Sequence, residues 1–169
     1  GSFNSTGIEV AGLNNGLSDG QSAWGDFNND GNLDVLVSGT DGTNNQLRTY
    51  ANNGNGTFKA QTSIFLGLGS GPNSVVAGDF NGDGLPDFAS ANYTAQNLSI
   101  FLGNGNGTFR VSTTNSLGSN AAHMVAGDFN NDGVTDLAYN NGIAAGSVGV
   151  LIANSTQTTT IPTISLLSV

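Results

Sequence analysis

The chain has 169 residues, of which 12 are acidic and three are basic, so its formal net charge is −9. With so few basic side chains, the protein lacks the positively charged surface that binds nucleic acid. Its negative charge also disfavours binding to an anionic membrane surface. The lack of cysteine excludes a disulfide framework, and the length suits one compact domain. The sequence has no apolar run long enough to span a membrane and no signal peptide, so we expect a mature piece of a longer protein.

The dominant feature of the chain is an internal repeat. A stretch of the form Gly-Asp-Phe-Asn-x-Asp-Gly-x-x-Asp occurs three times, with its first aspartate at positions 26, 79 and 128. The spacings of 53 and 49 residues are close to the period of a four-stranded propeller blade. We therefore divide residues 1–155 into repeats at about 13–66, 67–117 and 118–155, followed by an extended, threonine-rich tail or linker at 156–169.

Each repeat is predicted to contain four strands. Apolar and β-branched residues between turns rich in Gly and Asn place the strands of the second repeat at 74–78, 87–91, 98–102 and 108–111. No segment has the sustained 3.6-residue periodicity of a helix. The predicted fold class is therefore all-β, with three four-stranded, antiparallel, β-propeller-like blades.

The number of blades leaves several arrangements open. Closed propellers have four to eight blades. Three blades predict an open or partial propeller, a pairing of two chains, or a piece of a longer array. Residues 1–12 resemble the segment 56–67, which adds the alternative that they complete the last blade.

The three repeated loops are predicted metal sites. Oxygens of the side chains at loop positions 1, 3, 5 and 9 can converge with the carbonyl of position 7, and the glycine at position 6 permits a sharp turn. Such an oxygen shell suits Ca²⁺ better than Mg²⁺, which retains its waters. The predicted ligands are the side chains of Asp26, Asn28, Asp30 and Asp34 with the carbonyl of Asn32, those of Asp79, Asn81, Asp83 and Asp87 with the carbonyl of Leu85, and those of Asp128, Asn130, Asp132 and Asp136 with the carbonyl of Val134.

The distribution of charge supports three calcium ions. Nine of the 12 acidic residues lie in the loops, and three carboxylates around one point repel one another unless a cation lies between them. One divalent ion per loop would change the formal charge from −9 to −3. The alternative is that the Asp-Gly and Asn-Gly pairs only form turns, but turns alone do not require acids at positions 1, 5 and 9.

The loops are not EF-hands. An EF-hand needs a bidentate Glu at position 12, where this chain has Val37, Ser90 and Tyr139. The residues after each loop predict a strand rather than the flanking helix of an EF-hand or a dockerin-type pair.

The loops resemble the FG-GAP/VCBS repeats, which are the blades of integrin-α-like β-propellers. The resemblance also includes the Val-Ala-Gly before two loops, at 76–78 and 125–127, and the Gly-Asn-Gly-Asn-Gly-Thr-Phe segment at 103–109, which varies to Asn-Gly-Asn-Gly-Thr-Phe at 53–58. It implies that each loop joins two strands of a blade and holds a structural calcium ion. The tail is also weakly similar to the place where the outer domain of a bacterial flagellin rejoins its helical part.

Catalytic groups are not predicted. His123 is the only histidine and has no Ser or Cys nucleophile near it in sequence, so we expect a structural role. The carboxylates that would serve a glycosidase are already assigned to cations. Trp24 is predicted to pack between blades.

The sequence is compatible with two functions. The first is a non-enzymatic, calcium-stabilised module on the cell surface or in the secreted fraction, for adhesion or recognition of a glycan or protein. The second is a display domain of a filament protein such as a flagellin, with no ligand of its own but with self-association or a parent filament as partner. Calcium loops of this type fill outside the cell, where free calcium is high, which favours an extracellular location.

Overall fold

The computed structural model describes residues 17, 20–66, 71–117, 120–141, 148–153 and 165–166. These residues contain strands and no helix, and so no helix that is long and apolar enough to cross a membrane. Residues 1–12, one candidate for completing the last blade, lie outside the described residues, as does most of the tail.

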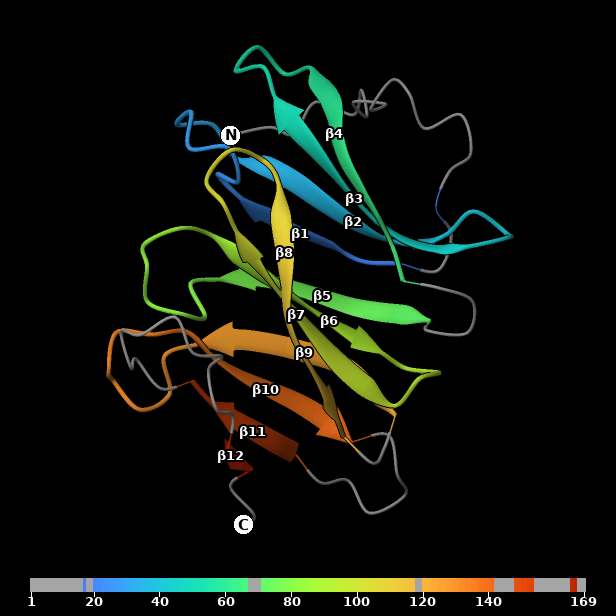
Figure 1. Cartoon of the computed structure of the whole chain (residues 1–169), viewed down its shortest axis with the longest axis vertical. Coiled ribbons are helices and arrows are strands. Elements are labelled where there is room, and N and C mark those ends of the chain that lie inside the picture. The colour runs from blue at the N-terminus through green and yellow to red at the C-terminus, as the bar shows by residue number, and fades with distance from the viewer. Residues whose placement is uncertain are drawn as a thin grey trace, which may run out of the picture.

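The strands form three separate sheets in which each strand pairs with its neighbours in the chain (Figure 1). The first blade contains β1 (Ser22–Gly25), β2 (Asp34–Thr40), β3 (Asn45–Asn52) and β4 (Phe58–Phe65); the second contains β5 (Pro72–Gly78), β6 (Asp87–Asn92), β7 (Asn97–Gly103) and β8 (Phe109–Ser116); the third contains β9 (Ala121–Gly127), β10 (Asp136–Asn141), β11 (Val148–Ile152) and β12 (Ser165–Leu166). All pairings are antiparallel.

This architecture confirms the all-β prediction and its three antiparallel sheets. In the second blade, the predicted strands coincide with β5 to β8 to within a few residues, and the largest difference is that β8 continues to Ser116. The place of the fourth strand in the third blade is taken by the two-residue β12, in which Ser165 pairs with Ile152 and Leu166 with Leu151. The segment predicted as tail thus contributes one short strand to the sheet.

The middle blade is covered on both sides. All six residues of β6 are buried, and so are six of the seven residues of β7. A strand with neighbours on both faces needs apolar or small side chains at every position rather than alternate ones, and the Phe-Ala-Ser-Ala run of β6 meets that need. The outer strand β8 has no buried residue and a polar sequence.

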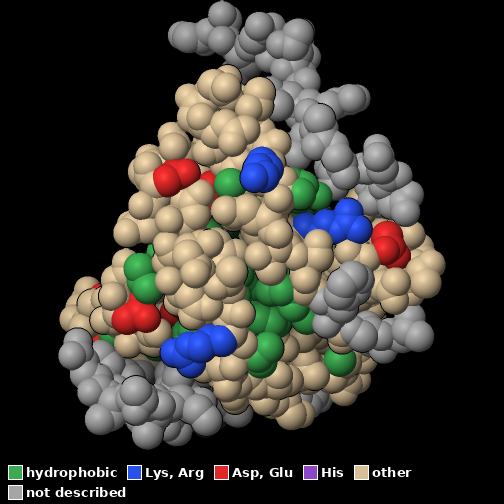
Figure 2. All heavy atoms as spheres, turned by 45° about the horizontal axis from the view of Figure 1, so that its top comes forward, with side chains coloured by type: hydrophobic (Ala, Val, Ile, Leu, Met, Phe, Trp, Pro, Cys, Tyr) green, Lys and Arg blue, Asp and Glu red, His purple; other side chains and the backbone are tan. Residues whose placement is uncertain are grey.

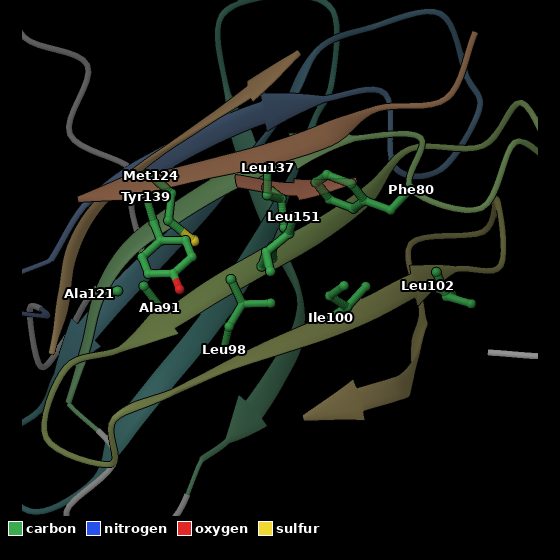
Figure 3. Close-up of a cluster of buried hydrophobic side chains, with 11 residues drawn as sticks. Phe80, Ala91, Leu98, Ile100, Leu102, Ala121, Met124, Leu137, Tyr139 and Leu151 are labelled. Atoms are coloured by element: carbon green, nitrogen blue, oxygen red, sulfur yellow. The ribbon is translucent and has the colours of Figure 1, made fainter. Parts of the chain in front are cut away.

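Two apolar cores hold the blades together. Between the second and third blades, Leu98 and Ile100 of β7 face Leu137, Tyr139 and other side chains of the third blade (Figure 3). Between the first and second blades, Phe88 and Phe101 stack at 4.6 Å between ring centroids and pack with residues of β1 to β3. Each fully buried side chain of this size contributes about 1.5–3 kcal/mol, so burial between blades stabilises the fold.

The first strands of the three blades lie side by side, and a polar network joins them. Gln21, Ser74 and His123 occupy equivalent positions before or in β1, β5 and β9. The Ser74 hydroxyl donates to Gln21 Oε1 at 3.0 Å and accepts from Met124 N–H at 3.0 Å. Gln21 Nε2 lies 3.3 Å from His123 Nδ1, so the histidine connects the first and third blades.

The environment of Trp24 differs from the predicted packing between blades. Its side chain is 53% exposed, and its ring contacts Phe58 of the same blade, with 6.1 Å between centroids. By the alternation of β1, Ala23 points toward the second blade and Trp24 to the opposite face, which it shares with the buried Val35 and Tyr50.

Charged side chains are sparse on the surface. The face shown in Figure 2 consists mostly of uncharged polar side chains and backbone, with a few separated acidic and basic groups. The acids that the sequence concentrates in its loops are therefore the main local charges of the molecule.

Candidate metal centre

Each repeated loop connects the first and second strands of its blade. The first loop lies between β1 and β2, the second between β5 and β6, and the third between β9 and β10. The loop begins at position 1, just after the first strand, and its position 9 is the first residue of the second strand. The antiparallel pairing of these two strands holds both ends of the loop together.

The aspartate at position 1 organises the turn. Asp26 Oδ1 accepts the N–H of Asp30 at 2.9 Å, and its Oδ2 accepts the N–H of Gly31 at 2.8 Å. Asn28 Oδ1 accepts the same Asp30 N–H at 3.0 Å, so oxygens from positions 1 and 3 converge on one point. The equivalent bonds in the other loops join Asp79 to Asp83 and Gly84, Asn81 to Asp83, Asp128 to Asp132 and Gly133, and Asn130 to Asp132.

The aspartate at position 5 completes this group. Asp30 Oδ2 accepts from Asn28 Nδ2 at 2.9 Å, and its Oδ1 accepts from Asn32 N–H at 2.8 Å. The same pair of bonds recurs in the second loop at Asp83 and in the third at Asp132. The structure therefore brings the side chains of positions 1, 3 and 5 together in all three loops.

Two residues of each loop have left-handed backbone. The glycine of position 6 has a φ of 87° at Gly31, in agreement with the sharp turn expected there. Position 4 is also left-handed, with a φ of 58° at Asn29, and the third loop has the same conformation at Asn131 and Gly133. Asn and Gly are the residues that tolerate this conformation. Position 4 is Asn, Gly and Asn in the three loops, so this left-handed position could have been predicted from the sequence but was not.

The aspartate at position 9 lies deeper than the others. Asp34, Asp87 and Asp136 are at most 1% exposed. Asp87 Oδ2 accepts the N–H of Phe80 at 3.0 Å, and its Oδ1 accepts the N–H of Gly103, at the end of β7, at 2.8 Å. The same bonds join Asp34 to Phe27 and Asn52, and Asp136 to Phe129 and Ala153.

This aspartate therefore links its loop to the third strand of the blade. The sequence reading assigned it only as a ligand and missed the structural link. Because each of its oxygens has a second lone pair, these hydrogen bonds leave room for a cation contact.

The carboxylates have different electrostatic environments. Burial raises the pKa of Asp87 to about 7, the charges of Asp83 and Asp79 add to this, and the N–H donors of Gly103 and Phe80 oppose it. Burial likewise raises the pKa of Asp34. Hydrogen bonds from the backbone and side chain of Asn32, then from Asn28, lower the pKa of the exposed Asp30. A cation would favour the charged form of both kinds of carboxylate.

The loops as they stand are not closed coordination shells. Among the described residues, no group of three or more acidic or histidine side chains is close enough together to hold an ion. The N–H of position 5 donates to the carboxylate of position 1, whereas the carboxylate of position 9 accepts the N–H of position 2. The donor set nevertheless fits a hard cation, because each loop presents three carboxylates and one amide oxygen on one turn.

A polar cleft of about 540 Å³ lies beside the first loop. Its walls include Asn28 and Asp30 of the loop, Lys59 and Gln61 of β4, and the turn that contains Asn106. The turn is anchored to the first blade, because Gly107 N–H donates to Phe27 O at 2.9 Å and the Thr62 hydroxyl donates to Gly107 O at 2.9 Å. None of the described residues that line this cleft is aromatic.

Comparison with known families decides what these repeats are. Two overlapping stretches, residues 26–90 and 79–139, match the model of the FG-GAP-like repeat. The chain belongs to the FG-GAP repeat family. Each FG-GAP match begins at position 1 of one loop and ends in the second strand of the next blade, so it covers one whole repeat and the loop of the following one. A comparison with curated proteins found no match.

Proposed function

We propose that the chain is a non-enzymatic, calcium-stabilised module of an extracellular or cell-surface protein, used for adhesion or recognition. The observation that carries this proposal is the recurrence of one hydrogen-bonded arrangement of positions 1, 3 and 5 in three loops. FG-GAP repeats typically form propeller-type surface modules that often act in adhesion, which supports the same conclusion. Calcium would be held by the fifteen residues predicted as ligands, one ion per loop.

Calcium has a structural role in this proposal. Each loop joins two strands, and its position 9 reaches a third strand through a buried carboxylate. A cation between positions 1, 5 and 9 would offset the repulsion of three carboxylates and hold these strands in register. The carboxylates are then structural groups, and His123 lies on β9 in hydrogen-bond contact with Gln21, which supports the absence of catalysis.

The cleft beside the first loop is the contact site that best fits recognition. Its walls present amide and hydroxyl groups, which suit a hydrophilic ligand such as a glycan. A second candidate function is the display domain of a filament protein, with no ligand of its own. The described residues of the cleft include no aromatic side chain on which a sugar ring could stack, which favours this candidate.

A binding survey separates the two functions. The chain would be applied to a glycan array and to extracellular-matrix proteins in millimolar-scale calcium and again in EDTA. A recognition module gives calcium-dependent binding that Gln61→Ala weakens, with the exposed Val111→Ala on β8 as control. Absence of binding in both conditions, together with a filament-forming sequence on each side of this segment in the parent gene, would support the display domain instead.

A further inference from the structure

Two turns of identical sequence lead from the third to the fourth strand in the first and second blades. The segment Asn-Gly-Asn-Gly-Thr-Phe occupies residues 53–58, from the end of β3 to the start of β4, and residues 104–109, from the end of β7 to the start of β8. Each turn therefore contains two Asn-Gly pairs. Such a pair can modify itself, because glycine has no side chain to hinder its nitrogen from reaching the preceding side-chain amide.

The reaction in question is deamidation. The backbone nitrogen of the glycine loses its proton and attacks Cγ of the preceding asparagine; a C–N bond forms, and the side-chain amide leaves as ammonia. Water then opens the cyclic imide to give aspartate or isoaspartate, and it is the only co-reactant. A hydrogen bond from the glycine N–H slows this reaction, because the bond must be broken before the nitrogen can attack.

The asparagine side chains have the same environment in both turns. Asn55 Oδ1 accepts the N–H and the hydroxyl of Thr57 at 3.0 and 2.6 Å. Asn106 Oδ1 accepts the same two donors of Thr108 at 3.1 and 2.6 Å. The first asparagine of each turn donates from Nδ2 to that threonine hydroxyl, at 2.8 Å in the first turn and 2.9 Å in the second. A difference in reactivity between the turns must therefore come from the glycine nitrogens.

The second Asn-Gly pair differs between the turns in its glycine. Gly107 is buried, and its N–H donates to Phe27 O at 2.9 Å, because this turn docks on the first blade. The Thr62 hydroxyl donates to Gly107 O at 2.9 Å and strengthens the contact. Gly56, the equivalent glycine of the first turn, is exposed, and its N–H makes no hydrogen bond with a described residue. The second asparagine should therefore react in the first turn and be protected in the second.

The first Asn-Gly pair shows the opposite pattern. In the first turn, Gly54 N–H donates to Asn52 Oδ1 at 2.9 Å. Gly103 takes the place of Asn52 in the second blade, so the N–H of Gly105 finds no acceptor among the described residues. A side chain at Gly103 would not fit, because its Cβ would lie 2.3 Å from Pro86 O. The loop before β6 thus prevents the same protection in the second turn.

The repeated loops are protected as well. Asn81 and Gly82 form the Asn-Gly pair of the second loop, and Gly82 N–H donates to Asp79 Oδ1 at 2.7 Å. The Asp-Gly pairs at positions 5 and 6 can form the same imide, with loss of water instead of ammonia. In all three loops, however, the glycine N–H of position 6 donates to the carboxylate of position 1, at 2.8–2.9 Å. The predicted metal ligands are therefore shielded from this chemistry.

We propose that the chain deamidates itself at Asn55 and Asn104, one site in each turn. The other three Asn-Gly pairs of the described residues are protected by the hydrogen bonds of their glycine N–H groups. Each reaction replaces a neutral amide with a carboxylate, so two reactions change the formal charge from −9 to −11. The sequence does not predict this crossed pattern, because the two turns are identical in sequence.

Peptide mapping by mass spectrometry tests the proposal on the native chain. The protein would be kept in mildly alkaline buffer with calcium, and the loss of each side-chain amide would be followed over time. Asn55 should react about tenfold faster than Asn106 or more, since one additional hydrogen bond at the attacking nitrogen raises the barrier by about this factor. Asn104 should exceed Asn53 by a similar factor. In concentrated urea, the two members of each comparison should react at similar rates.

One substitution tests the cause of the protection. Asn52→Gly removes the acceptor in the first turn, so Asn53 should then react about as fast as Asn104. Asn73→Ala is the matched control, because this asparagine lies in β5 and bonds to Ala122 O, away from both turns. Far-UV circular dichroism establishes that both variants are folded, and the comparison within the native chain does not depend on them.

Three results would overturn the proposal. The first is equal rates at all four turn asparagines of the native chain. The second is a difference that persists in urea, because the sequence and not the structure would then cause it. The third is an unchanged rate at Asn53 in folded Asn52→Gly, which would remove the role of the glycine hydrogen bond.

Discussion

Asp87 Oδ1 accepts a hydrogen bond from Gly103 N–H at 2.8 Å, which connects the start of β6 to the end of β7 across 16 residues of chain. The other oxygen of the same carboxylate accepts the N–H of Phe80 at 3.0 Å. One buried side chain thus fixes the beginning of its loop and the turn after the third strand. Asp34 and Asp136 make the same pair of bonds in the other blades.

Asp87→Asn should destabilise the chain even without metal. An amide has only one oxygen, so one of the two N–H donors would face an NH₂ group and remain without an acceptor. Leaving a buried donor unpaired costs about 1–3 kcal/mol. Urea denaturation at pH 4 in EDTA measures this cost, because Asp87 is then protonated in the folded state and the comparison with the neutral Asn involves no buried charge. Asp83→Asn, at an exposed position of the same loop, is the control and should change the free energy of unfolding by less than about 0.5 kcal/mol. Equal losses in both variants would refute the structural role of position 9.

The stability of the metal-free chain should fall as pH rises. The pKa of Asp87 is raised from 3.8 to about 7, so the folded state holds more protons than the unfolded state between these two values. Stability therefore decreases with pH in this window, by at most about 1.4 kcal/mol per pH unit for this group, and levels off above it. Asp34, whose pKa is also raised, acts in the same direction.

Thermal melts in EDTA at intervals from pH 4 to pH 8 check this dependence. The slope should be smaller in Asp87→Asn, which has no proton to lose there. Saturating calcium should suppress the slope, because it stabilises the charged carboxylates. A melting temperature that increases with pH in EDTA across this window would contradict the raised pKa.

The three loops should bind calcium independently. Asp30→Ala, Asp83→Ala and Asp132→Ala each remove position 5 of one loop and should each lower the stoichiometry by one ion, measured by isothermal titration calorimetry. Asp41→Ala is the control, because Asp41 lies in the turn between β2 and β3, outside the loops. A variant whose stoichiometry is unchanged would remove its loop from the set of sites.

The core between the second and third blades should be sensitive to truncation. Leu98 is fully buried there, so Leu98→Ala should cost about 2–5 kcal/mol, since the cavity adds to the lost apolar burial. Val111→Ala on the exposed β8 should remain within about 0.5 kcal/mol of the native chain. Chemical denaturation in calcium compares the two. A small loss at Leu98 would mean that the blades are loosely packed.

Much of the fold could be predicted because its signals are local. Turns rich in Gly and Asn delimit β5 to β8, and the repeat period gives the number of blades. The convergence of positions 1, 3 and 5 was also predictable, since these residues lie on one short turn. The partners of Asp87 were not, because Gly103 belongs to another strand and only the strand register places it beside the loop.

The environment of Trp24 was missed for a related reason. Its equivalents Ala77 and Ala126 pack against or border the cores, so alignment alone suggested packing between blades. Each blade has one face toward the preceding blade and one toward the following blade, and a first blade has no predecessor among the described residues. Trp24 shares its face with Val35 and Tyr50, which are buried, so its exposure could not be predicted from the aligned positions alone.

Calcium dependence of the melting temperature tests the central claim most directly. The chain would be melted in millimolar-scale calcium, in excess EDTA, and in magnesium as the control ion. A site held at about 100 times its dissociation constant adds roughly 2.7 kcal/mol, so three filled sites should raise the melting temperature by on the order of 15–30 °C in calcium but not in magnesium. Equal melting temperatures in all three conditions, with no calcium in the purified protein by elemental analysis, would show that the aspartate-rich loops are only turns.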